Sequence, residues 1–155
     1  MSSLQKKVLL IGNTGVGKTT FLKKLRTGEF DLKFISTYGV EVHPVDTGKI
    51  KFYVWDCAGQ ERLAVNKTSF YEGTDACIIM FDTQSTESLI SIEKHANLII
   101  KSLGLIPIIL VCNKNDLIPS YKEIHKEAIY ISSKNDTFRE LMLPFLKLEK
   151  MLLNE

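Results

Sequence analysis

The sequence predicts an α/β fold: a mostly parallel six-stranded sheet with one antiparallel strand and with helices on both faces. Two continuous apolar runs, residues 76–81 and 107–112, are typical of central strands in a parallel sheet. Strand-like and helix-like patterns alternate along the chain, as they do where helices connect parallel strands. With 155 residues, of which 45% are hydrophobic, we expect residues 1–155 to form one domain.

The first half of the chain supplies a strand, a helix and a hairpin. An apolar run at residues 8–11 leads into a glycine-rich turn, and residues 20–25 leave that turn as a helix. A polar stretch then runs to Thr37 and is expected to be a loop. Residues 40–44 and 50–55 alternate at period two around a turn at Asp46-Thr47-Gly48, which predicts a β-hairpin and hence the antiparallel strand.

The second half continues with helices between strands. Residues 87–103 carry apolar side chains at helical spacing and predict a helix between the two central strands. Residues 128–131 predict a short last strand. Residues 138–153 predict a strongly apolar last helix that Pro144 interrupts, because proline lacks the N–H that a helix interior requires.

Composition and chain ends argue against several classes of protein. A net charge of +2 is too near neutral to indicate nucleic-acid or membrane binding by itself. Cys57, Cys77 and Cys112 form no C-x-x-C pair, so we expect buried, reduced thiols of an intracellular protein. A signal core, a glycine at position 2 and a terminal cysteine are all missing from the sequence. We therefore expect a soluble monomer with no membrane anchor and no nucleic-acid partner.

The glycine-rich turn, Gly12 to Thr19, fits the pattern G-x-x-x-x-G-K-[ST] of a phosphate-binding loop. Glycines at 12, 15 and 17 permit positive φ and let backbone N–H groups close on phosphate oxygens. The positive end of the following helix dipole faces the same anion. Lys18 is expected to reach the outer phosphates, and the Thr19 hydroxyl to ligate the accompanying Mg²⁺. A turn that binds nothing is the alternative, which the strand before it and the helix after it disfavour.

A second motif, Asp56 to Glu61, directly follows a predicted strand. Asp56 is placed to hold Mg²⁺, usually through a water, as the acidic partner of the phosphate loop. Gly59 permits a backbone N–H to approach the terminal phosphate, and Gln60 is a candidate to orient an attacking water. By itself such a segment would be a turn with a solvated aspartate.

A third motif, Asn113 to Asp116, also follows a strand and predicts guanine recognition. The Asp116 carboxylate accepts hydrogen bonds from N1–H and the N2 amine of guanine, whereas adenine would leave the buried charge unpaired. The stem of Lys114 is expected to lie against the base, and Asn113 to tie this loop to the phosphate loop. An Asn/Asp-rich turn is the alternative that the phosphate loop makes less attractive.

Three further positions complete the candidate site with weaker signals. A backbone N–H at Ser133, in the segment Ser132 to Lys134, could donate to guanine O6. Phe30 could pack against the base, although core packing accounts for it nearly as well. Thr37 is a candidate for a second hydroxyl on Mg²⁺.

Together these motifs resemble the Ras superfamily of small GTP-binding switch proteins, and within it the Ran family of nuclear-transport GTPases. The resemblance covers nearly the whole chain, and these segments carry it: Gly17-Lys18-Thr19-Thr20-Phe21, Thr27 to Phe30, Gly39-Val40-Glu41-Val42-His43-Pro44, Val54-Trp55-Asp56, Ile78 to Asp82, and Pro144-Phe145-Leu146. The Gly39 to Pro44 run and the proline in the last helix favour Ran over Rab.

The resemblance implies GTP hydrolysis to GDP and phosphate, with Mg²⁺ as cofactor and a change of protein partners as the output. It implies that Phe30 stacks beside guanine, that Thr37 closes on Mg²⁺ and the γ-phosphate, and that Gln60 positions the water, with Lys18, Thr37 and Gln60 serving catalysis. Importin-β-type receptors, an exchange factor and a GTPase-activating protein would be partners, in cytoplasm and nucleus. The implied phosphate contacts are Asn13, Thr14, Gly15, Val16, Gly17, Lys18, Thr19 and Thr20.

Four departures from the Ran pattern bear on function. Thr14 stands where these proteins usually have glycine, and would crowd Gln60 and an activating protein, so hydrolysis is expected to be slow. We expect the acidic C-terminal tail of Ran to be missing after the last helix, and the hairpin around Thr47-Gly48 is several residues tighter than in Ran. After a strand of about four residues, some eleven remain within Leu117 to Ile131 for a crossover. The fourth major helix is therefore expected to be short or absent.

Three functions follow from these observations. The first is a Ran-like switch that hydrolyses GTP. The second is a binding module that mimics Ran, hydrolyses GTP slowly or not at all because of Thr14, and sequesters transport or regulatory factors. The third is an adenine-nucleotide kinase or ATPase, which the Asn113 to Asp116 motif disfavours.

Overall fold

The computed structural model describes residues 4–25, 34–35, 40–57, 71–120 and 125–154. Within them, seven strands form one sheet in the order β2-β3-β4-β1-β5-β6-β7. The strands are β1 (Leu4–Ile11), β2 (Phe34–Ile35), β3 (Glu41–Asp46), β4 (Ile50–Asp56), β5 (Ala76–Asp82), β6 (Ile108–Asn113) and β7 (Ile129–Tyr130). Strands β4, β1, β5, β6 and β7 pair in parallel, whereas β3 is antiparallel to both of its neighbours.

The predicted α/β class and its single antiparallel strand are confirmed. All six expected strands are present, and the hairpin pairs Asp46 with Lys51 beside its turn. The seventh strand, β2, lies in the stretch that was expected to be a loop. It consists of two residues at the sheet edge, which pair with Val42 and Glu41 of β3. A strand this short leaves no alternation in the sequence by which it could be recognised.

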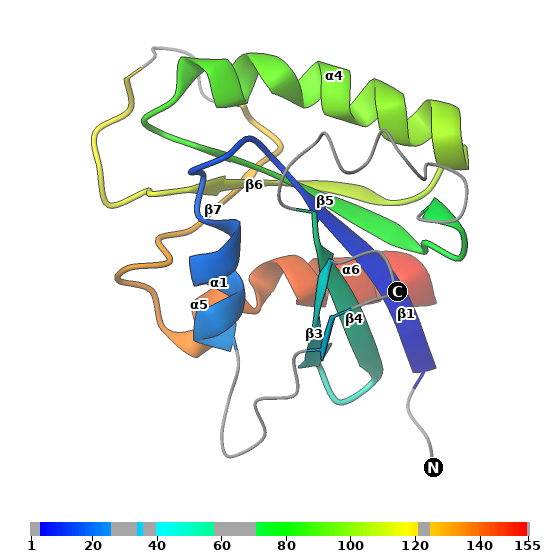
Figure 1. The fold of residues 1–155 in the computed structure, drawn as a ribbon. Helices are drawn as coiled ribbons and strands as arrows, with labels where there is room; N and C mark the ends of the chain where they lie inside the picture. Colours follow the sequence, from blue (N-terminus) through cyan, green and yellow to red (C-terminus); the bar gives the residue numbers. More distant parts are fainter. Residues whose placement is uncertain (1–3, 26–33, 36–39, 58–70, 121–124, 155) are drawn as a thin grey trace.

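Helices cover both faces of the sheet (Figure 1). Helix α4 (Thr86–Leu103) lies on one face, and α1 (Lys18–Leu25), α5 (Phe138–Leu141) and α6 (Leu143–Leu153) lie on the other. Every residue of β5 is buried, as expected of a strand between two helical layers. On the face of α1 and α6, the ring of Phe145 stacks on Phe21 at 6.1 Å and tilts against Phe52 at 5.5 Å.

The predicted interruption of the last helix is also present. Thr137 caps α5 by accepting a hydrogen bond from the N–H of Glu140, whose side chain accepts one from the Thr137 N–H in return. The helix is interrupted at Met142, and α6 begins at Leu143 with Pro144 in its first turn, where a missing N–H is tolerated. Sequence and structure agree on the physical cause of the break.

The β6–β7 crossover contains no helix in its described residues, 117–120 and 125–128. This agrees with the expectation of a short or absent helix, although residues 121–124 lie outside the description. Cys57, Cys77 and Cys112 are buried, and none of the three forms a disulfide within the described residues. Among the helices in the described ranges, none has the length and apolar character needed to cross a membrane.

Candidate functional site

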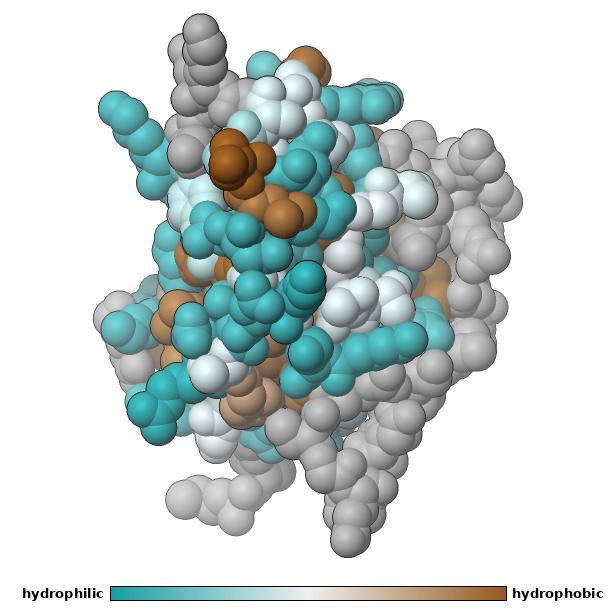
Figure 2. Space-filling view, turned by 90° about the vertical axis from the view of Figure 1, so that its left-hand side faces the viewer, coloured by the Kyte–Doolittle hydropathy of each residue, from teal (hydrophilic) through white to brown (hydrophobic). Residues whose placement is uncertain are grey.

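The candidate residues follow the carboxyl ends of neighbouring parallel strands. The register places Leu10 of β1 beside Asp56 of β4, and Asp82 of β5 beside Asn113 of β6. The turn between β1 and α1 and the loops after β6 and β7 therefore lie at one edge of the sheet, on the left-hand side of Figure 1. Figure 2 looks onto that side, where hydrophilic side chains predominate. In parallel α/β sheets this edge is where ligands bind.

The glycines of the β1–α1 turn serve two different geometric needs. Gly15 and Gly17 have φ values of 87° and 99°, a region that side chains disfavour. Gly12 differs from the prediction, because it is not among the residues with positive φ. Glycine is required at position 12 because the backbone passes close to β5, where a Cβ would collide with the carbonyl oxygen of Met80. A Cβ at Gly17 would likewise collide with the Asn113 amide.

Lys18 is buried at the start of α1, with its ammonium folded over the turn. Its Nζ donates to the carbonyl oxygens of Gly12, at 2.7 Å, and Asn13, at 3.2 Å. Burial lowers the pKa of Lys18 from its usual value, and the Asp56 carboxylate opposes that shift. The cation thus lies in the turn among carbonyl oxygens, where an anion would favour its charged form.

Thr19 and Asp56, two predicted Mg²⁺ ligands, are in direct contact. The Thr19 hydroxyl donates to Oδ2 of Asp56 at 3.1 Å. Oδ1 of Asp56 is buried and has no hydrogen-bond partner in the described part of the chain. Burial raises the pKa of Asp56, opposed by the Thr19 hydrogen bond and by the charge of Lys18. A buried carboxylate oxygen that lacks a donor, beside a hydroxyl, fits a hard divalent cation.

Asn113 joins three loops through its side chain. Its Nδ2 donates to the carbonyl of Val16 at 2.9 Å, which is the expected tie to the phosphate loop. Its Oδ1 accepts from the N–H and the hydroxyl of Ser133, each at 3.0 Å. The Ser133 N–H that was expected to donate to guanine O6 thus donates to Asn113 in this structure, and the contact with guanine stays a prediction.

Lys114 bridges two strand ends rather than projecting freely. Its Nζ lies 2.8 Å from the Gly15 carbonyl and 2.9 Å from Oδ2 of the buried Asp82. Its backbone adopts φ 62°, an uncommon conformation for lysine that costs about 1–3 kcal/mol. The stem is thereby held across the space between the β1–α1 turn and the β6 loop. Sequence reasoning missed Asp82 as its partner.

A cavity of about 280 Å³ opens where these loops meet. Its lining comes from the start of α1 and from the loops after β6 and β7: Gly17, Thr20, Asn113, Lys114, Asp116, Leu117, Ser133 and Lys134. At its rim, the Ser132 hydroxyl donates to Oδ1 of Asp116 at 2.8 Å, which fixes the carboxylate. The cavity thus brings together the predicted base-recognition residues of two loops distant in sequence.

Helix α4 also contacts the phosphate loop, which the sequence did not predict. The Asn13 amide donates to the Ser91 hydroxyl at 3.2 Å, and its Oδ1 lies 3.2 Å from Nε2 of His95. Burial lowers the pKa of His95. Thr14, the next residue, is exposed. The only signal for these contacts was the helical spacing of Ser91 and His95, which does not identify a partner.

Four predicted site residues lie outside the described residues: Phe30, Thr37, Gly59 and Gln60. The described part therefore contains the phosphate loop with Lys18, two of the three predicted Mg²⁺ ligands and the predicted base pocket, but not Thr37, Gly59 and Gln60, which were also expected to act at the terminal phosphate.

The fold and this site define a class: a phosphate-loop nucleotide-binding domain on a mostly parallel sheet. Residues 7–149 match the protein-family model described as the Ras family, so the chain belongs to that family. Its general character follows. It is a GTP-binding switch with GTPase activity that takes GTP or GDP with Mg²⁺ and binds regulators and effectors.

Proposed function

We propose that this edge of the sheet binds Mg-GTP and Mg-GDP, and that hydrolysis switches the protein between two partner-binding states. The contact between Thr19 and Asp56, beside the buried ammonium of Lys18, is the observation that carries this proposal. Mg²⁺ would be held by Thr19, Asp56 and Thr37, and would neutralise charge on the phosphates. The phosphates would be wrapped by residues 13–20.

The electrostatics of the described residues support a ligand that brings both a negative and a positive charge. Burial lowers the pKa of Lys18 and raises that of Asp56, so both groups lose the stabilisation of their charged forms. A phosphate beside Lys18 and a divalent cation beside Asp56 would each restore it. The site is thus adapted to an anion and a cation that arrive together, as they do in a Mg-nucleotide.

The proposed base is guanine, which Asp116 would recognise through N1–H and the N2 amine. Support comes from the Ser132 hydrogen bond, which holds Asp116 at the cavity that Lys114 and Asn113 also line. Because the Ser133 N–H donates to Asn113 here, the N–H of Lys134, the next residue of the cavity lining, is a second candidate donor to guanine O6. Phe30 would stack beside the base.

The proposed biological role is Ran-like, with partners among nucleocytoplasmic transport factors such as importin-β-type receptors, an exchange factor and an activating protein. Support comes from the Gly39 to Pro44 run, of which Glu41 to Pro44 belong to β3, and from the proline at the start of α6. The protein would act in cytoplasm and nucleus. Co-elution of the GTP-loaded protein, but not the GDP-loaded protein, with an importin-β-type receptor is the expected result.

A second candidate function is a Ran-mimicking module that holds such factors with slow or absent hydrolysis. The observation that favours it is Thr14, an exposed β-branched residue within the phosphate loop. The resemblance to Ran implies that bulk at this position obstructs Gln60 and an activating protein. The two candidates differ in hydrolysis and not in nucleotide binding.

Single-turnover phosphate release from the GTP-loaded protein tests both, with the unmodified chain and Thr14→Gly measured alone and with a Ran-type activating protein. Strong stimulation of the unmodified protein would support the switch and reject the module. Slow release that Thr14→Gly restores would support the module. If neither GTP nor GDP binds at micromolar concentration with Mg²⁺, the nucleotide proposal itself fails.

A further inference from the structure

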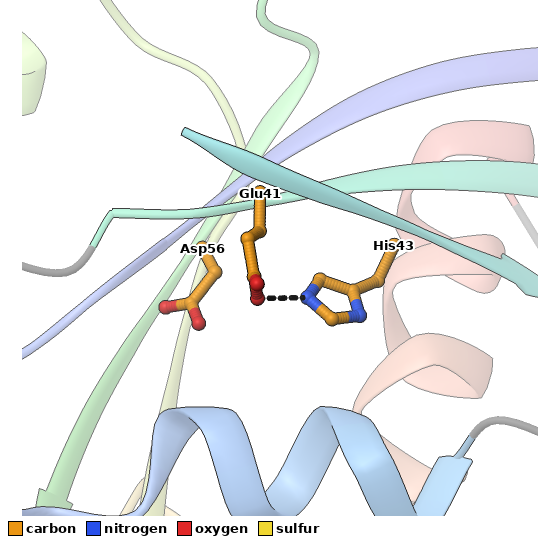
Figure 3. Close-up of side chains that lie close together, drawn as sticks. All are labelled: Glu41, His43 and Asp56. Carbon is orange, nitrogen blue, oxygen red and sulfur yellow. Dashed lines mark hydrogen bonds and ion pairs between the residues drawn. The ribbon is translucent and has the colours of Figure 1, made fainter. Parts of the chain in front are cut away.

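Three potential metal ligands of different chemistry gather on one side of the β3–β4 hairpin. Glu41 lies opposite Asp56 in the antiparallel register, and His43 follows two positions later on the same face of β3. Figure 3 shows the three side chains on the side of the hairpin that faces α1, with Glu41 between Asp56 and His43. One ligand atom from each residue lies within 4.8 Å of the other two.

The surroundings of this cluster call for a cation. His43 is 1% exposed and Asp56 4%, and Oδ1 of Asp56 lacks a hydrogen-bond partner among the described residues. Two carboxylates directly opposite each other in a sheet repel, and the charge of Glu41 raises the pKa of Asp56 further. Nε2 of His43 lies 3.2 Å from Oε2 of Glu41, and one ligand atom of Asp56 lies within 4.8 Å of both residues.

We propose that Glu41, His43 and Asp56 form a binding site for Zn²⁺. An imidazole nitrogen with two carboxylate oxygens suits zinc, whereas Mg²⁺ and Ca²⁺ prefer oxygen ligands alone. Ligands of one tetrahedral zinc lie ~3.4 Å apart, given metal–ligand bonds of about 2.1 Å. The His43–Glu41 pair already meets that spacing. The Glu41 side chain is 35% exposed, so solvent reaches the cluster on this side.

Zinc in this site would compete with the Mg-nucleotide. Asp56 is the shared residue, because its Oδ2 also contacts Thr19 at the phosphate loop. The Asp56 carboxylate would lie between Zn²⁺ and the Mg²⁺ of the nucleotide. When zinc is present, this carboxylate would move toward His43 and away from Mg²⁺. Zinc therefore acts as an antagonist of nucleotide retention, through Asp56 alone and without contact with the base pocket.

The site is tested by titrating Co²⁺, a visible substitute for zinc, into the protein as purified. We expect one equivalent with the intense visible absorption of a four-coordinate ion, no thiolate charge-transfer band, and displacement by Zn²⁺. Glu41→Gln and His43→Gln should each weaken binding by about 10–100-fold or more, since even residues behind the ligands contribute that much. His125→Gln, which changes a histidine outside the cluster, should stay within about twofold.

Because His43 is buried, Glu41→Gln is the decisive variant if His43→Gln fails to fold by circular dichroism. Unchanged Co²⁺ affinity in folded Glu41→Gln would overturn the proposal, leaving an ordinary His43–Glu41 ion pair. The weak absorption of a six-coordinate ion would also overturn it, because that ion would occupy the Mg²⁺ position. A thiolate band would assign the metal to a cysteine.

Competition is measured as the rate of GDP release with and without Zn²⁺ at constant Mg²⁺. Zinc should accelerate release from the unmodified protein and His125→Gln, and leave Glu41→Gln at the rate seen without zinc. Equal acceleration in all three would overturn the shared role of Asp56. If GDP does not bind at all, the nucleotide proposal fails while the Co²⁺ titration still decides the metal site.

Discussion

Asp56 illustrates how one residue can lower the stability of the fold that contains it. Its carboxylate is 4% exposed, it accepts one hydrogen bond from Thr19, and its pKa is raised by burial. Ionisation is therefore less favourable in the folded chain than in the unfolded chain, where the usual value is 3.8. Without a bound cation, the contribution of Asp56 to stability is most favourable below that value and declines as pH rises through its folded-state pKa.

Asp56→Asn should accordingly raise the stability of the metal-free protein at neutral pH. Removing a buried, incompletely paired charge is worth about 1–3 kcal/mol, and each kcal/mol raises Tm by roughly 2–4 °C in a chain of this size. The gain should shrink as pH falls toward the unfolded-state value, as thermal melts at several pH values would show. The same variant should lose the Mg²⁺-dependent part of its nucleotide affinity. A lower Tm at neutral pH would contradict the burial effect.

At the scale of elements, the β1–α1 turn, the β6 loop and the β7 loop are fastened together by Asn113. Its amide bonds the Val16 carbonyl and its Oδ1 accepts two hydrogen bonds from Ser133. All of these groups are buried. Asn113 thereby holds the phosphate loop, which lies about a hundred positions earlier in the sequence, at a fixed distance from the base pocket.

Asn113→Ala should loosen that spacing. Each buried group left unpaired costs about 1–3 kcal/mol, so GDP release should accelerate about tenfold or more, given ~1.4 kcal/mol per factor of ten. Asn115→Ala, which changes an exposed neighbour in the same loop, is the matched control and should release GDP at the unmodified rate. Stopped-flow release of a fluorescent GDP measures both. Equal rates for the two variants would mean that the junction does not control the site.

At the scale of the whole molecule, the last helix closes one face of the sheet through Phe145. The ring is fully buried and contacts Phe21 of α1 and Phe52 of β4. Three elements that are distant in the sequence, α1, β4 and α6, thus share one aromatic cluster.

Phe145→Ala should cost about 3–5 kcal/mol, a large fraction of the ~5–15 kcal/mol that stabilises a typical domain. Phe138→Ala, which removes a ring that is 45% exposed, is the matched control and should cost far less. Denaturant unfolding with tryptophan fluorescence compares them, since Trp55 is the single tryptophan. A loss below about 1 kcal/mol for Phe145→Ala would show that the face closes without the ring.

Much of this architecture could be predicted from residue patterns. The apolar runs of β5 and β6, the period-two hairpin and Pro144 each act locally, so they leave a local signal. The phosphate loop was predictable because phosphate binding requires glycine, lysine and threonine at fixed positions in one short segment. The Asn113 tie was expected, but its capture of the Ser133 N–H was not, because that depends on how two loops fit together. The Glu41, His43 and Asp56 cluster depends on cross-strand register, which single-strand periodicity does not reveal.

Beyond the site, the Thr47 hydroxyl at the hairpin turn donates to the carboxylate of Glu149 in α6. This hydrogen bond holds the turn end of the hairpin, which is the end distant from the phosphate loop, against α6. Displacement of the Glu41 end would therefore rotate the hairpin about the Thr47 contact and shift the last turns of α6. Nucleotide exchange should then change the amide hydrogen-exchange rates of residues 148–153, and Thr47→Val should abolish that change.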